Sequence, residues 1–122
     1  MRILAVDDHP IFRAGLVALI QNHYPKADIQ QAENGQEAID LIEEERFDIV
    51  ILDMDMPEKS GMDVLAYVQE KKAKVRIVIL TMHNDELFFN ESFNKGAKGF
   101  VLKEDSSLEI IDCLEKVLMD LP

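Results

Sequence analysis

Polar side chains suited to chemistry stand directly after four short aliphatic runs of this sequence. Asp7 and Asp8 follow the first run, and three later runs are followed by Asp53, Thr81 and Lys103. Carboxylates that lie close together raise one another's pKa, so three acids in one place would either be partly protonated or hold a cation. Oxygen ligands without thiolates favour a hard divalent ion such as Mg²⁺. A carboxylate beside Mg²⁺ is suited to phosphoryl transfer as the nucleophile.

The segments between these residues predict the elements that would bring them together. The aliphatic runs, expected to be strands, are residues 3–6, 49–52, 77–80 and 100–102, with a weaker run at 29–32. Helices are expected at residues 10–22, 35–45, 61–72, 85–95 and 106–119. Runs that are apolar throughout are typical of parallel strands covered by helices on both faces. We therefore expect a single α/β domain, a three-layer doubly wound (βα)5 sandwich of the flavodoxin-like type with sheet order 2-1-3-4-5.

This topology would give the polar residues a common location. All strands of a parallel sheet end at the same edge, and sites in doubly wound folds lie there, near the switch in strand order. Glu33 and Asn34, which follow the weak run, fall at the sheet margin and outside the cluster. Simpler interpretations exist, because the tandem acids could cap a helix, Thr81 could cap a strand end and Lys103 could be solvated. The shared edge favours the functional interpretation.

The charge balance and the single cysteine exclude several classes of protein. Among 122 residues, 13 Lys and Arg stand against 24 Asp and Glu, which gives a net charge of −11. Such a chain repels phosphate backbones, so these residues are not expected to bind nucleic acid by themselves. The one cysteine, Cys113, can form neither an internal disulfide nor a thiolate metal cluster. No apolar run reaches the ~20 residues of a membrane span, so we expect a cytoplasmic location and no membrane partner.

Four motifs, in their order and spacing, resemble those of a known family. They are Val6-Asp7-Asp8-His9-Pro10, Leu52-Asp53-Met54-Asp55-Met56-Pro57 with Gly61 four places on, Leu80-Thr81, and Gly96-Ala97-Lys98-Gly99-Phe100-Val101-Leu102-Lys103. From Arg2 to Met119, the sequence resembles the receiver domain of two-component response regulators. The stretches Asp-Asp-His-Pro-Ile-Phe-Arg-Ala-Gly-Leu, Leu-Thr-Met-His-Asn-Asp-Glu and Lys-Glu-Asp resemble more narrowly the NarL/FixJ (LuxR-type) subfamily.

The resemblance implies a role for each acid at the predicted edge. Asp53 would be the phosphoacceptor, and the phosphoryl donor would be a phosphohistidine on a sensor histidine kinase. Mg²⁺ would be bound directly by the carboxylates of Asp8 and Asp53, by Asp7 through water and by the backbone carbonyl of Asp55. On this interpretation the chain is not an enzyme for a separate substrate, since it catalyses only its own phosphoryl transfer and dephosphorylation.

The resemblance also implies a switch. Thr81 would donate its hydroxyl to a phosphoryl oxygen, and Lys103 would pair with the phosphoryl group. Inward movement of Thr81 would let Phe100 turn toward the vacated space and change the packing of the fourth-helix face. The positions expected to tune phosphoryl lifetime or access are Asp55, Met82 and His83. His9, although near the site, is interpreted as structural.

The resemblance extends to domain organisation and partners. Residues 1–119 are expected to form the receiver domain, and residues 120–122 to begin a linker to a C-terminal output domain absent from this sequence. In the subfamily that output is a helix-turn-helix domain, so control of transcription would use DNA contacts outside these residues. Apolar residues around the first helix predict a phosphorylation-dependent homodimer; they are Ile11, Val17 and Ile20. A stand-alone receiver that acts through protein contacts is the alternative.

Three other interpretations fit the residues less well. Asp53-Met54-Asp55 resembles the Asp-x-Asp motif of haloacid-dehalogenase-type phosphatases, but Met56-Pro57 follow and the chain has no room for a cap domain. A flavin site would need a Gly/Ser/Thr-rich phosphate loop after the first strand, where two acids, a histidine and a proline stand instead. A receiver that no longer takes phosphate would lack Asp53 or Lys103, and both are present.

Overall fold

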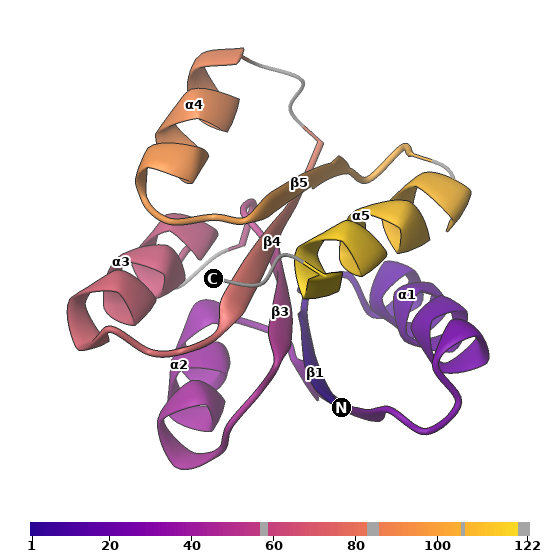
Figure 1. Ribbon diagram of the computed structural model, residues 1–122. Coiled ribbons are helices and arrows are strands. Elements are labelled where there is room, and N and C mark those ends of the chain that lie inside the picture. The colour runs from indigo at the N-terminus through magenta and orange to yellow at the C-terminus, as the bar shows by residue number, and fades with distance from the viewer. Residues whose placement is uncertain (57–58, 83–85, 106, 120–122) are drawn as a thin grey trace.

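Five strands alternate with five helices in the part of the chain that the computed structural model describes, which is residues 1–56, 59–82, 86–105 and 107–119 (Figure 1). The strands are β1 (Arg2–Val6), β2 (Asp28–Ala32), β3 (Ile49–Asp53), β4 (Arg76–Thr81) and β5 (Gly99–Leu102). The helices are α1 (Pro10–His23), α2 (Gly35–Glu44), α3 (Gly61–Lys71), α4 (Glu86–Asn94) and α5 (Ser107–Met119). Every predicted element is confirmed, and each end lies within one residue of its expected position.

The strands form one parallel sheet in the order β2-β1-β3-β4-β5, as predicted. Helices α1 and α5 cover one face of the sheet, and α2, α3 and α4 cover the other (Figure 1). The carboxyl ends of the strands are in register, since Asp53 pairs with Leu80 and Thr81 pairs with Leu102. The residues that follow β1, β3, β4 and β5 therefore lie along a single edge of the sheet.

Alternate residues of the central strands enter one of two apolar cores, which explains why these strands are apolar throughout. In β3, Val50 and Leu52 pack with α2 and α3, whereas Ile49 and Ile51 pack with α1 and α5. All four side chains are buried. Because burial of one aliphatic side chain contributes about 1.5–3 kcal/mol, β3 is firmly anchored on both faces. Its last residue, Asp53, is therefore held on a rigid base.

A capping box fixes the start of α3 beside the site edge. The Ser60 hydroxyl accepts a hydrogen bond from the Asp63 N–H at 3.4 Å, and the Asp63 carboxylate accepts one from the Ser60 N–H at 2.9 Å. Such reciprocal bonds satisfy N–H groups that the first helical turn leaves without partners. Residue 106, where the last helix was expected to begin, and the linker expected at 120–122 fall outside the described residues.

The last helix, α5, buries one apolar stripe. Its buried members are Ile110, Ile111, Leu114 and Val117. This stripe packs α5 against the same face of the sheet as α1. The packing holds α5 in place against the sheet just after β5 ends. None of the described helices combines the length and the apolar character that crossing a membrane requires.

Candidate functional site

Buried charges occupy the edge where the strands end. Asp7, just after β1, and Asp53, at the end of β3, are both fully buried. The Lys103 ammonium, just after β5, lies 3.0 Å from Oδ2 of Asp7 and 3.1 Å from Oδ2 of Asp53. The backbone positions this lysine, because its N–H donates to the Thr81 carbonyl at 2.8 Å. The fold thus brings together residues that the sequence placed at this edge.

Burial and neighbouring charges set the protonation of the two ends of this ion pair. Burial raises the pKa of Asp53 to about 6 from its ordinary 3.8, and the Asp7 carboxylate adds to the rise. The Asp55 N–H, which donates to Oδ1 of Asp53 at 3.0 Å, and the Lys103 ammonium both act in the opposite direction. Burial lowers the pKa of Lys103, but the contacts with Asp7 and Asp53 outweigh it and leave that pKa raised. The lysine stays charged.

The cluster also offers ligand atoms for a cation. Oxygens of Asp7, Asp8 and Asp53 and a ring nitrogen of His9 all lie within 4.8 Å of one another. Oδ1 of Asp8 is a buried atom that makes no hydrogen bond within the described structure, whereas Oδ2 of Asp7 contacts the Lys103 ammonium. Three carboxylates beside one ammonium leave an excess of negative charge, and hard oxygen donors are the ligands that Mg²⁺ prefers. These residues therefore fit a divalent cation.

Thr81 is linked to Asp53 through Asp55. The Thr81 side chain is fully buried at the end of β4, and its hydroxyl donates to Oδ2 of Asp55 at 3.2 Å. The Asp55 N–H in turn donates to the Asp53 carboxylate. A chain of hydrogen bonds therefore joins the end of β4 to the end of β3. The sequence assigned Thr81 and Asp55 separate roles and did not predict the bond between them.

A glycine allows the loop after β3 to lie directly against α3. A Cβ atom on Gly61 would lie 2.3 Å from Sδ of Met54 and 2.9 Å from the carbonyl oxygen of Asp53. Contacts this short would force the loop to move, so only glycine fits here without displacing the residue after the buried acid. Pro57, which the sequence places in the same loop, falls outside the described residues.

The predicted switch residue Phe100 contacts an aromatic residue of α4. Its ring is half-buried, and its centroid lies 5.0 Å from that of Phe89, which lies 4.7 Å from that of Phe93. This contact joins β5 to α4, so a new position of the Phe100 ring would alter the packing of that helix. Met82 is 66% exposed, and His83, the other predicted tuning residue, lies outside the described residues.

The fold and this cluster agree with a comparison against known protein families. The family model of the response regulator receiver domain matches residues 3–115. This chain belongs to that family. All four receiver motifs noted in the sequence lie within the matched region, so the resemblance that they indicated is confirmed.

Individual relatives describe this receiver domain more narrowly. The transcriptional regulatory protein YdfI of Bacillus subtilis is 36% identical over 117 residues, which are 96% of this chain and 54% of YdfI. The chain spans about half the length of the curated relatives that it matches.

Solved structures resemble this chain as well. A LuxR-family two-component response regulator from Aurantimonas has a TM-score of 0.89 at 34% identity, over 96% of this chain and 84% of that one. Response regulator TrrA from Thermotoga maritima, solved in complex with Mg²⁺-BeF, has a TM-score of 0.84 at 33% identity, over 95% and 97%. The LuxR-type resemblance is confirmed.

Two residues of the receiver site make contacts that the sequence did not predict. His9, interpreted from the sequence as structural, places its Nδ1 atom 3.0 Å from Oδ1 of Asp7 and 3.1 Å from Oδ1 of Asp8. Arg13 donates from Nη1 to the Asp7 carbonyl at 2.6 Å. Arg13 lies in the first turn of α1, which begins three residues after Asp7, and this short separation was the signal that its side chain could reach the end of β1.

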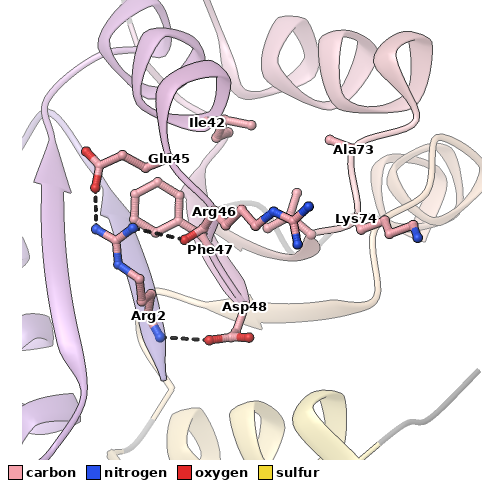
Figure 2. Close-up of a pocket in the computed structure, with 9 residues that line it drawn as sticks. Arg2, Ile42, Glu45, Arg46, Phe47, Asp48, Ala73 and Lys74 are labelled. Carbon is pink, nitrogen blue, oxygen red and sulfur yellow. Dashed lines mark hydrogen bonds and ion pairs between the residues drawn. The ribbon is translucent and has the colours of Figure 1, made fainter.

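A hollow also lies at a distance from the receiver's charged cluster. Its volume is about 520 Å³, and it opens at the opposite edge of the sheet, where β1 and β3 begin (Figure 2). The Arg2 guanidinium is bonded there to Glu45 and to the Arg46 carbonyl, while the Arg2 N–H donates to Asp48 (Figure 2). Among the described residues, the group of possible metal ligands lies at the other edge. The hollow is therefore separate from the site.

Proposed function

We propose that this receiver domain is a phosphorylation-activated switch in which Asp53 accepts a phosphoryl group with Mg²⁺ bound beside it. The observation that carries the proposal is the Lys103 ammonium, 3.1 Å from Asp53 within a cluster of three acids. The donor is a phosphohistidine on a sensor histidine kinase. Membership of the receiver family supports this assignment.

The chain's own residues supply an acceptor and the charges around it. A carboxylate oxygen of Asp53 attacks phosphorus while the bond from phosphorus to the donor imidazole breaks, and the electron pair of that bond leaves with the imidazole. Negative charge spreads over the three phosphoryl oxygens during the transfer. Lys103 neutralises part of that charge, and the Thr81 hydroxyl, released from Asp55, donates to one oxygen. Asp53 is already an anion when it reacts, so no protein base is needed.

The acids of the cluster hold the metal in this proposal. The ligands are the carboxylates of Asp8 and Asp53, the backbone carbonyl of Asp55, and Asp7 through water. The buried Oδ1 atom of Asp8, which makes no hydrogen bond within the described structure, supports this assignment. When bound, Mg²⁺ would supply further positive charge to the phosphoryl group, in addition to that of Lys103.

Phosphorylation then changes the packing at α4. The Thr81 hydroxyl leaves Asp55 for a phosphoryl oxygen, and Phe100 turns from its contact with Phe89 toward the space that Thr81 vacates. The surface formed by α4 and β5 thereby takes a second conformation, which partners can distinguish from the first. Asp55, Met82 and His83 tune the lifetime of the phosphoryl group or the access of donors to it.

The output of the switch is control of transcription. A relative named as a transcriptional regulatory protein and a LuxR-family structure support this assignment. The DNA contacts would be made by a helix-turn-helix domain outside these 122 residues, and a phosphorylation-dependent homodimer would pair two such domains. The alternative is a stand-alone receiver that acts through protein contacts. A cytoplasmic location, and the absence of any activity on separate substrates, stay predictions from the sequence.

Transfer of label from an autophosphorylated sensor kinase tests the acceptor. We expect acid-labile label on the wild-type chain and none on Asp53→Asn. Asp112→Asn is the matched control, because Asp112 is exposed on α5 and pairs only with Lys116 among the described residues. Persistent label on Asp53→Asn would point to another acceptor. Addition of Mg²⁺ and beryllofluoride, which mimics the phosphoryl group, should shift the NMR signals of Thr81 and Phe100, and unchanged signals would contradict the switch.

A further inference from the structure

The side chain of Asp55 holds the Thr81 hydroxyl in this structure. The hydroxyl oxygen lies 3.2 Å from Oδ2 of Asp55, and the Thr81 side chain is fully buried at the end of β4. An ionised carboxylate accepts hydrogen bonds and donates none, so the hydrogen in this bond belongs to the threonine. The hydroxyl hydrogen that Thr81 would offer to a phosphoryl oxygen is therefore directed at Asp55.

Backbone hydrogen bonds place Asp55 beside the threonine. The Asp55 N–H donates to Oδ1 of Asp53 at 3.0 Å, and the N–H of Met54 donates to the Leu80 carbonyl at 3.0 Å. The first bond joins Asp55 to the phosphoacceptor, and the second joins the preceding residue to β4, one position before Thr81. Although Asp55 is exposed, the path of the loop thus brings its carboxylate to the end of β4.

Two acceptors compete for one hydroxyl hydrogen at this place. In the proposed function Thr81 donates to a phosphoryl oxygen on Asp53, so its bond to Asp55 has to break when that oxygen arrives. The new bond replaces an existing bond to an anion, and the stabilisation that it brings is reduced by the loss of the old one. A contact made in only one of two conformations shifts the equilibrium between them. The Asp55 side chain therefore favours the conformation without a phosphoryl group.

We propose that the bond from Thr81 to Asp55 is an autoinhibitory contact, in which the Asp55 carboxylate opposes the conformation that binds the phosphoryl group. The inference rests on the proposed function, because it concerns the same threonine and the same phosphoryl position. It gives Asp55 two opposed roles, since its backbone carbonyl is assigned to the metal and supports phosphorylation. A ligand binds more weakly when few molecules are in the competent conformation, so loss of the contact raises the affinity for a phosphoryl mimic.

Calorimetric titration of the intact chain with beryllofluoride at saturating Mg²⁺ tests the contact. We expect Asp55→Ala to bind the mimic about 2–12-fold more tightly than the wild type, the range that corresponds to one hydrogen bond. Asp55 is exposed, so this variant should fold. Asp112→Ala is the matched control, because it removes another exposed carboxylate, on α5, and should leave the affinity unchanged.

A double-mutant cycle separates the contact from the charge of Asp55. The carboxylate also repels an anionic mimic, so its removal could tighten binding without any contribution from Thr81. Thr81→Val removes the hydroxyl and keeps a side chain of similar size at this buried position. Asp55→Ala should therefore tighten binding at least twofold less in the Thr81→Val background than in the wild-type background, and that difference measures the contact.

The outcomes of the cycle distinguish this inference from the proposed function. Equal increases in affinity in the two backgrounds would show that only the charge of Asp55 matters, and would overturn the autoinhibitory contact. An unchanged or weaker affinity in Asp55→Ala would overturn it as well. In each of these cases, binding of the mimic by the wild type leaves the phosphoacceptor site standing. Failure of the wild type to bind beryllofluoride with Mg²⁺ would overturn both proposals.

Discussion

Nζ of Lys103 lies 3.1 Å from Oδ2 of Asp53, although the two residues are 50 positions apart in the chain. The pair forms because β3 and β5 end at the same edge of the sheet and because the Lys103 N–H is bonded to the end of β4. Only 7% of the lysine side chain is exposed, so solvent screens the pair weakly. The ammonium thus supplies positive charge inside the acid cluster, and removing it or the acid should have opposite effects on the metal-free protein.

Lys103→Met should destabilise the metal-free protein. The change leaves Asp7 and Asp53 buried without their shared counter-charge, and removal of one partner from a buried ion pair costs on the order of 3 kcal/mol. Mg²⁺ should stabilise this variant more than it stabilises the wild type, because the metal replaces the lost positive charge. Urea unfolding in chelator and in Mg²⁺ measures both effects. Lys116→Met, which removes a solvent-exposed lysine, should change stability by less than about 1 kcal/mol. Equal losses in the two variants would contradict the role of the buried pair.

Asp53→Asn should stabilise the metal-free protein at neutral pH. Burial raises the pKa of Asp53 to about 6 in the folded state, above the ordinary 3.8. The folded chain therefore holds this proton more tightly than the unfolded chain, and that stabilisation is complete below about pH 4 and lost as the pH rises through about 6. The asparagine variant does not lose it, so its advantage should be about 1–3 kcal/mol at pH 7.5 and vanish near pH 4.

Denaturant unfolding in chelator, repeated from pH 4 to pH 8, measures that advantage. Asp112→Asn serves as the exposed control and should differ from the wild type by less than about 0.5 kcal/mol throughout. A difference between Asp53→Asn and the wild type that stays constant across this range would show that Asp53 does not titrate as its burial predicts.

Gly61→Ala should destabilise the protein and disturb the acceptor loop. The added Cβ would lie 2.3 Å from Sδ of Met54 and 2.9 Å from the carbonyl oxygen of Asp53. Overpacking of this kind typically costs about 1–3 kcal/mol. Gly15→Ala is the matched control, because no atom lies within 4 Å of its added Cβ and alanine favours the middle of α1 by about 1 kcal/mol. Thermal unfolding should therefore move in opposite directions for the two variants, and a shared direction would argue against the close approach at Gly61.

The sequence predicted the residue positions that strand order determines. It did not predict the side-chain contacts that depend on the path of the loops. Asp7, Asp53 and Lys103 could be placed together because strand order and chain direction alone bring strand ends to one edge. The bond from Thr81 to Asp55 could not be foreseen, since it depends on the path of the loop after β3 and on side-chain rotamers. The direction of the His9 ring depends in the same way on a local turn, in which the Asp7 carboxylate accepts the His9 N–H.

Phe89→Ala should make the receiver easier to activate. The Phe89 ring contacts Phe100 at 5.0 Å, a contact that favours the resting position of Phe100 if that ring turns inward on activation. An aromatic pair contributes about 0.5–1.5 kcal/mol, so its loss should raise the affinity for beryllofluoride in Mg²⁺ by about 2–12-fold. Calorimetric titration measures the change, and Leu108→Ala, which removes an exposed side chain from α5, should have no effect. An unchanged affinity in Phe89→Ala would mean that the contact is equally strong in both states, because a contact shifts a two-state equilibrium only by its difference between the states.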